Sequence, residues 1–190
     1  QTNIPESGNG LPDLLDEVRW ELDFILKMQD PDSGGFYHMV QPTEDGTIPA
    51  ARGTRYIEDV ADGRENVRPT STTGSAVAAL AQAALVYAPF DADYAAILQS
   101  AAELGWGYLE ANPEGVAPVS GPYSDDDDSD DRFWAAAALY RLTNQAVYGD
   151  FVKAVYQDVP TFFTTEDDNA YGVGIMGMVG WLNYAYSQNP

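Results

Sequence analysis

Cysteine is absent from the 190 residues, and histidine occurs once, as His38. Without cysteine the chain can form no disulfide, no thiolate nucleophile and no zinc-thiolate centre. A single histidine cannot build a multi-histidine metal site. Beside Phe36 and Tyr37, His38 is either a hydrogen-bonded structural residue or a functional group, and the sequence leaves both readings open.

Basic residues are also scarce. Lysine and arginine total 9 against 30 aspartates and glutamates, which gives a formal net charge of −21. A protein that binds nucleic acid neutralises phosphates with basic side chains, and an anionic membrane surface repels a chain of this charge. We therefore expect neither a nucleic-acid partner nor a membrane partner. The charge is compatible with a neutral ligand such as a sugar, or with a salt-rich environment.

Long apolar runs are missing as well. The longest run, near residues 172–180, is too short and too rich in glycine to span a bilayer. The segment from Gln1 to Pro5 has neither the basic nor the apolar region of a signal peptide, so we expect that a signal peptide has been removed or that this is not the native start. Hydrophobic residues nevertheless make up 45% of the chain, enough for one domain with a sizeable core.

What the chain does contain is a series of helical patterns. Apolar residues at helical spacing predict six helices, over about residues 11–29, 70–87, 92–112, 129–143, 148–159 and 171–188. The first carries two apolar stripes on different faces, one of Leu15, Leu22 and Ile25 and the other of Trp20, Phe24 and Met28. A helix that is apolar on so wide an arc is buried on more than one side, as in a two-layered helical assembly. Strand signals are nearly absent outside residues 36–40, so the pattern predicts an all-α fold.

An acidic segment precedes the fourth expected helix. Its six carboxylates belong to Asp125, Asp126, Asp127, Asp128, Asp130 and Asp131. We expect Ser129 to cap the helix, with Asp130 and Asp131 in its first turn, where the helix dipole favours negative charge. The other four repel one another unless a cation lies among them, and calcium suits an irregular loop of protein oxygens better than magnesium. A solvated acidic loop is the alternative.

Four stretches of the chain resemble family 9 of the glycoside hydrolases, the inverting cellulases. They run from Asn3 to Gln29, from Gly34 to Val40, from Ala79 to Ala84 and from Tyr123 to Ala137. The resemblance covers about residues 3–188. It implies an (α/α)6 barrel, two concentric rings of helices, of which six helices are about half. It also implies a secreted enzyme that cleaves β-1,4-glucan or a related polysaccharide.

Neither catalytic carboxylate of the family matches a position in this chain. In the family, an Asp-Ala-Gly-Asp motif that carries the general base lies upstream of the matching stretch, and the general-acid glutamate lies downstream. The resemblance therefore implies that residues 1–190 are a partial catalytic domain, inactive without the remainder of that domain. A non-catalytic, calcium-stabilised helical carbohydrate-binding or scaffold module is the alternative from a different class, and another (α/α)6 hydrolase or lyase is a second enzyme alternative.

Two kinds of site residue follow from the resemblance. Many members of the family hold a calcium ion before the fourth helix, and the matching positions are Asp126, Asp127, Asp130, Asp131 and Asp167. The family usually has glutamate where Asp131 stands, so this ligand is shorter by one methylene. Tyr123 matches an aromatic residue that borders the substrate cleft. Its ring is expected either to stack on a glucosyl unit or to pack within the loop.

Overall fold

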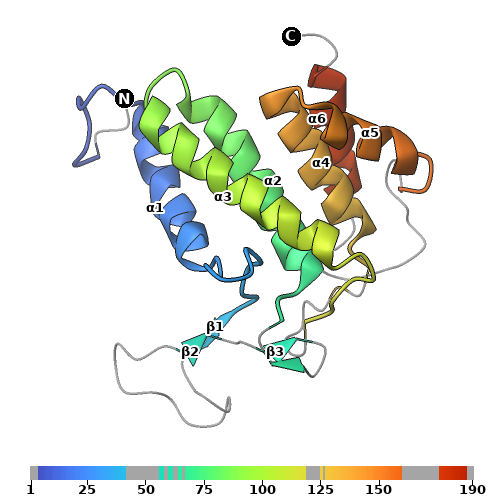
Figure 1. Ribbon diagram of the computed structural model, residues 1–190. Coiled ribbons are helices and arrows are strands. Elements are labelled where there is room, and N and C mark those ends of the chain that lie inside the picture. Colours follow the sequence, from blue (N-terminus) through green and yellow to red (C-terminus); the bar gives the residue numbers. More distant parts are fainter. Residues whose placement is uncertain are drawn as a thin grey trace.

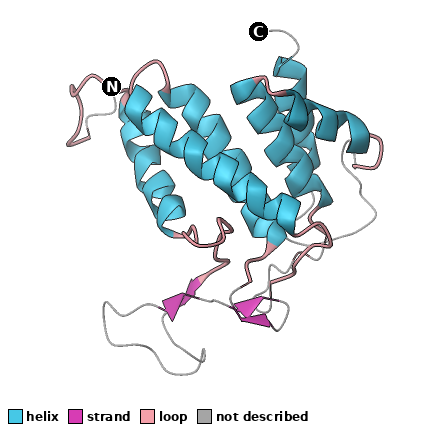
Figure 2. Ribbon diagram, in the orientation of Figure 1, coloured by secondary structure: helices cyan, strands magenta, loops and turns pink. Residues whose placement is uncertain are grey.

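The computed structural model describes residues 4–41, 56–57, 60–61, 64–65, 67–118, 125, 127–159 and 176–187. Within these ranges the chain is helical, with four short strands (Figures 1 and 2). The helices are α1 (Asp13–Lys27), α2 (Thr70–Tyr87), α3 (Ala92–Ala111), α4 (Ser129–Thr143), α5 (Ala146–Val155) and α6 (Met176–Ser187). The strands are β1 (Val40–Gln41), β2 (Tyr56–Ile57), β3 (Val60–Ala61) and β4 (Arg64–Glu65).

All six expected helices are present, with ends that differ by a few residues. The limits of α2 and α4 agree with the sequence pattern, whereas α1 is shorter at both ends. Residues 171–175 of the expected sixth helix lie outside the described residues. The strand expected over residues 36–40 is reduced to β1, which pairs antiparallel with β2. Phe36 instead forms an isolated bridge with Gln29 at the end of α1.

The helices lie in two layers. In one layer α4 lies between α2 and α6 and contacts both. In the other, α3 packs against α2 and α5 packs against α4, while α1 lies beside α2 (Figure 1). Helices therefore alternate between the inner layer and the outer layer along the chain, as a double ring requires.

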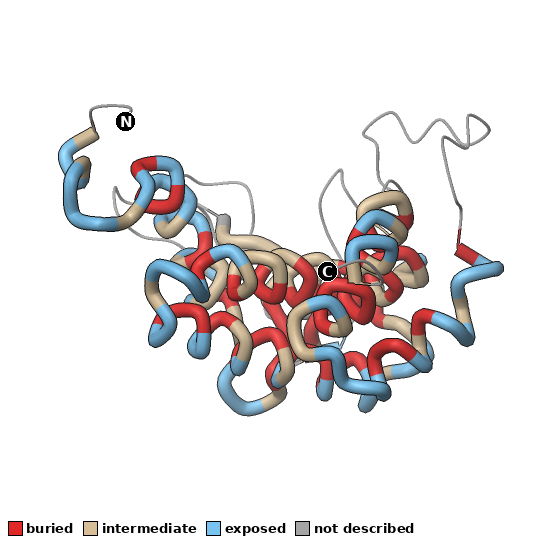
Figure 3. Tube along the Cα trace, turned by 90° about the horizontal axis from the view of Figure 1, so that it is seen from above, coloured by how far each residue is buried: buried red, intermediate tan, exposed pale blue. Residues whose placement is uncertain are grey.

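Small residues allow the inner helices to approach closely. A Cβ atom added at Gly74 of α2 would lie 2.7 Å from Cβ of Asp131 on α4, and one added at Gly180 of α6 would lie 2.5 Å from Cδ1 of Phe133. Four buried alanines of α4, at positions 135–138, serve the same purpose. Figure 3 shows that buried residues gather where the layers meet. None of the described helices is long and apolar enough to cross a membrane.

The expected burial of both faces of α1 is wrong for the described chain. Leu15, Leu22 and Met28 are buried, but Trp20 is 72% exposed and Phe24 is 48% exposed. The neighbours of α1 lie on its other side, where the hydroxyl of Tyr87 on α2 donates to the carbonyl of Leu15, and the hydroxyl of Tyr94 on α3 donates to Asp23 at 2.8 Å. Trp20 and Phe24 of the second stripe therefore form an apolar surface that the described chain leaves open to solvent, whereas Met28 of the same stripe is covered.

Candidate functional site

The connections between helices differ strongly in length. Residues 28–69, 112–128 and 156–175 lead into the inner helices α2, α4 and α6, whereas residues 88–91 and 144–145 lead out of α2 and α4. The inner helices begin at the same end of their layer, with β1 and β3 nearby (Figure 1). Binding and catalytic residues are concentrated on loops that a rigid scaffold positions. The candidate site is therefore at this end, which we call the loop end.

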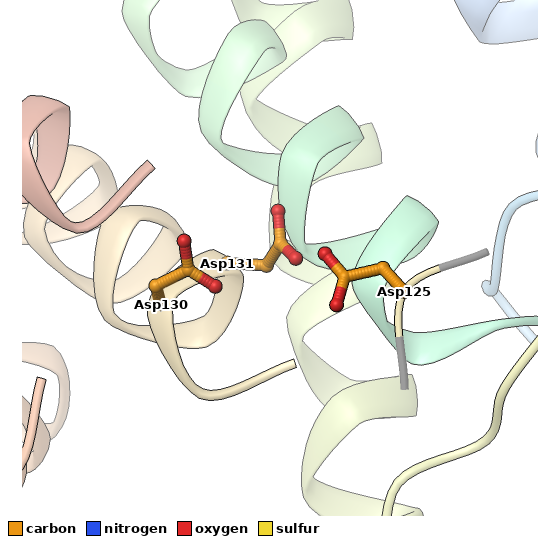
Figure 4. Close-up of side chains that lie close together, drawn as sticks. All are labelled: Asp125, Asp130 and Asp131. Atoms are coloured by element: carbon orange, nitrogen blue, oxygen red, sulfur yellow. The ribbon is translucent and has the colours of Figure 1, made fainter. Parts of the chain in front are cut away.

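Three carboxylates come together at the loop end. Asp125 on the connection to α4, and Asp130 and Asp131 in the first turn of α4, each place one oxygen within 4.8 Å of the others (Figure 4). Asp130 is 6% exposed and Asp131 is 3% exposed, while Asp125 is half-buried. Carboxylates this close and this buried repel one another, so the arrangement favours a bound cation or bound protons.

Asp131 points from α4 towards α2. The hydroxyl of Ser75, one residue after Gly74, donates a hydrogen bond to Oδ1 of Asp131. Burial raises the pKa of Asp131 to about 8, against the lowering effect of Ser75, and the charges of Asp130 and Asp125 add to the rise. Without a cation, Asp131 thus holds a proton at neutral pH.

Asp130 points towards the start of α6. Burial raises the pKa of Asp130, although the backbone amide of Gly177 on α6 acts in the opposite direction. Its Oδ2 is buried and has no hydrogen-bond partner in the described part of the chain. An unpaired buried polar group costs about 1–3 kcal/mol, so this oxygen fits a cation ligand better than a purely structural role. An all-oxygen donor set of this kind suits a hard divalent cation such as calcium.

The nearest arginine on the same helix is already paired. Arg132 forms an ion pair of 2.8 Å with Asp128, the residue that precedes α4. Its guanidinium also donates to the carbonyl oxygens of Leu109, at 2.7 Å, and Asn112, at 2.6 Å, at the end of α3. Arg132 thus anchors the start of α4 to the outer layer and leaves the three clustered carboxylates to other partners.

A second set of contacts joins the loop end to α2. The amide of Thr70 donates to the carbonyl of Val116 at 2.9 Å, and the amide of Val116 donates to Oγ1 of Thr70 at 2.8 Å. The hydroxyl of Ser71 lies 3.5 Å from the carbonyl oxygen of Asp125. The connection that carries Asp125 is therefore held against the first turn of α2.

The structure brings together part of the expected metal site. Asp130 and Asp131 meet as expected, and Asp125 is the third member of the group. Asp127 is exposed, and its carboxylate accepts from the amide of Ser129 at 3.0 Å. The remaining expected residues, Asp126, Asp167 and Tyr123, lie outside the described residues.

The expected helix cap at Ser129 is wrong, because Asp128 is the residue that precedes the helix and Ser129 is its first residue. Sequence reasoning also did not single out Ser75. The contact of Ser75 with Asp131 depends on the packing of α2 against α4, which no local pattern reveals. Asp125 was visible as a member of the acidic run, but spacing alone does not distinguish it from its neighbours.

Comparison with known proteins identifies relatives over almost the whole chain. The family model described as Glycosyl hydrolase family 9 matches residues 2–188. The xyloglucan-specific endo-beta-1,4-glucanase BoGH9A of Bacteroides ovatus is 32% identical over 95% of this chain and 32% of its own length. Endoglucanase D of Acetivibrio thermocellus is 33% identical over 98% of this chain and 29% of its own length. A metagenome-derived family 9 endoglucanase of known structure matches with a TM-score of 0.70 and 35% identity, over 95% of this chain and 32% of that chain.

The chain thus spans about a third of the length of the relatives it matches. The solved relatives have the (α/α)6 barrel fold. The expected fold is confirmed, with about half of the barrel helices in this chain. The chain belongs to glycosyl hydrolase family 9.

Proposed function

We propose that residues 1–190 are part of the catalytic domain of an enzyme that hydrolyses β-1,4-glucan or a related polysaccharide with inversion. The observation that carries the proposal is the family match over residues 2–188. The relatives include enzymes named as endoglucanases, one of them specific for xyloglucan. A polysaccharide substrate also fits a strongly acidic chain, because a neutral glycan carries no charge for the protein to repel.

Inverting hydrolysis needs two carboxyl groups about 6.5–9.5 Å apart. One activates water and the other protonates the leaving oxygen. The clustered aspartates of this chain are much closer together and share one buried environment, so they do not fit this pair. We assign the catalytic pair to the remainder of the catalytic domain, and we assign to this chain the inner helices that support the loop end. A polymeric substrate is too large to enter a cell, which supports a secreted enzyme.

We further propose calcium as a structural ion of this domain. Asp125, Asp130 and Asp131 would hold it, and Asp126, Asp127 and Asp167 stay proposed ligands. When bound, the ion supplies positive charge at the start of α4. Because Asp131 contacts Ser75 and Asp130 faces Gly177, this charge would hold α2, α4 and α6 together at the loop end. Tyr123, on the connection to α4, is the proposed aromatic contact for a glucosyl ring.

The full-length protein that contains this sequence tests the proposal. We expect it to release reducing sugars from β-1,4-glucan or xyloglucan, with products of inverted anomeric configuration by NMR. The isolated 190-residue chain serves as the control and should release none. Each missing acid or base contributes about 10²–10⁴-fold to the rate. Binding of glucan without any turnover by the full-length protein would instead favour a non-catalytic carbohydrate-binding module.

A further inference from the structure

The segment that follows α1 is fixed to the first turn of α2. The amide of Phe36 donates to Oγ1 of Thr73 at 3.0 Å, and Nδ1 of His38 lies 2.9 Å from Oγ1 of Thr72. Phe36 is almost completely buried between the layers. The segment therefore lies at the loop end, where α2 and α4 begin.

A buried ion pair also contacts the segment that follows α1. Arg68, next to the start of α2, forms an ion pair of 3.3 Å with Asp30, and its guanidinium lies 4.0 Å from the ring centre of Tyr37. The hydroxyl of Tyr108 on α3 accepts from the amide of Arg68 at 2.8 Å and donates to its carbonyl at 2.7 Å. The backbone around Tyr37 and His38 is thus held by both layers of the fold.

Within the described part of the chain, one nitrogen of the His38 imidazole has a hydrogen-bond partner and the other has none. Thr72 fixes the ring through Nδ1, and no described residue hydrogen-bonds to Nε2. The side chain is only partly buried. Either tautomer leaves Nε2 able to bond a hydroxyl group, because a hydroxyl both donates and accepts. An oriented imidazole beside a partly exposed tyrosine ring suits a sugar, which presents hydroxyl groups around an apolar face.

We propose that His38 is a substrate-binding residue whose Nε2 hydrogen-bonds to a hydroxyl group of a neutral glycan, and that Thr72 is the positioning residue for its ring. The proposal rests on the proposed function and assigns one contact within it. A metal ligand is a poor alternative, because His38 is the only histidine in the sequence. An anionic ligand is equally poor, because the acidic cluster lies at the same end.

Two substitutions in the full-length enzyme distinguish a role of His38 in substrate binding from a role in stabilising the fold. His38→Asn keeps a polar atom near Thr72 and loses the position of Nε2, whereas His38→Gln keeps a polar group near the position of Nε2 and loses the bond to Thr72. We expect His38→Asn to raise KM for a soluble β-1,4-glucan about 3- to 10-fold, the loss of one hydrogen bond, with an unchanged melting temperature. His38→Gln should have a KM nearer to that of the wild type and a lower melting temperature. Lys153→Gln, at an exposed position of α5, is the control for both measurements.

The opposite pattern overturns the proposal. If His38→Asn has the KM of the wild type while His38→Gln loses both affinity and stability, His38 only supports the fold. If the wild-type protein releases no sugar from any glucan, the proposed function is wrong. The binding affinity for cellotetraose, measured by titration, then tests the role of His38. Binding that His38→Asn weakens supports the contact without catalysis, and absence of binding overturns it.

Discussion

Asp131 is the residue in which burial and charge conflict most directly. Its carboxyl group is nearly inaccessible and lies beside two other carboxylates, which raises its pKa to about 8. In the unfolded chain the same group titrates near 3.9. Without divalent cations the folded state therefore binds a proton that the unfolded state has released, throughout the interval between these values.

The sign of the resulting pH dependence follows from linkage. Because the native state holds more protons than the unfolded state, the stability of the cation-free protein should fall as pH rises from about 4 to about 8. Thermal melting in a chelating buffer measures this. Asp131→Asn, which cannot ionise, should flatten the curve in that interval. A wild-type stability that rises over the same interval would contradict the raised pKa.

Gly74 offers a second test at the scale of a single residue. A methyl group there would lie 2.7 Å from Cβ of Asp131, so Gly74→Ala must push α2 away from α4. Overpacking of this kind costs about 1–3 kcal/mol. Gly107→Ala, at an exposed position of α3, is the matched control, because no atom lies within 4 Å of the added Cβ, and it should be neutral or slightly stabilising. Equal denaturation midpoints for the two variants would show that the helices separate freely.

At the scale of elements, the starts of three inner helices meet around the acidic cluster. Calcium at 100 times its dissociation constant should add about 2.7 kcal/mol to the free energy of unfolding. Asp130→Ala should remove most of the calcium-induced rise in melting temperature, because it removes the buried oxygen that has no described partner. Glu110→Gln, at an exposed position of α3, is the control and should leave that rise intact. If the melting temperature of the wild type is the same with calcium and with chelator, the three aspartates do not bind calcium and are only an acidic surface.

The sequence predicted the helices well because their signals are local. Alanine-rich α2 and the acidic start of α4 are each visible in one window of residues. The burial of each helix face was harder to predict. Periodicity shows that Trp20 and Phe24 form a stripe, but it does not show what covers them. The membership of the acidic cluster was only partly predictable for the same reason. The backbone of Asp125 lies against Ser71 at the start of α2, whereas the carboxylate of Asp127 accepts from the amide of Ser129, and residue spacing predicts neither contact.

At the scale of the whole molecule, the net charge of −21 is the dominant electrostatic fact. Self-repulsion of this size destabilises a compact state, and salt screens it with a Debye length of about 3 Å at 1 M. We therefore expect a higher melting temperature in 1 M potassium chloride than in dilute buffer, with chelator present in both. Sucrose in place of salt is the control for effects on hydration. A melting temperature that is independent of salt would show that the acidic groups are already compensated within the fold.

The open face of α1 also gives the protein an optical reporter. Indole emission shifts to shorter wavelength when water is excluded, and Trp20 is 72% exposed whereas Trp106 is buried. If the remainder of the domain covers α1, the emission difference between wild type and Trp20→Phe should be blue-shifted in the full-length protein relative to the isolated chain. An unchanged difference spectrum would mean that Trp20 meets water in both. The difference spectrum of Trp20 would thus report whether the remainder of the domain covers α1, without substrate or label.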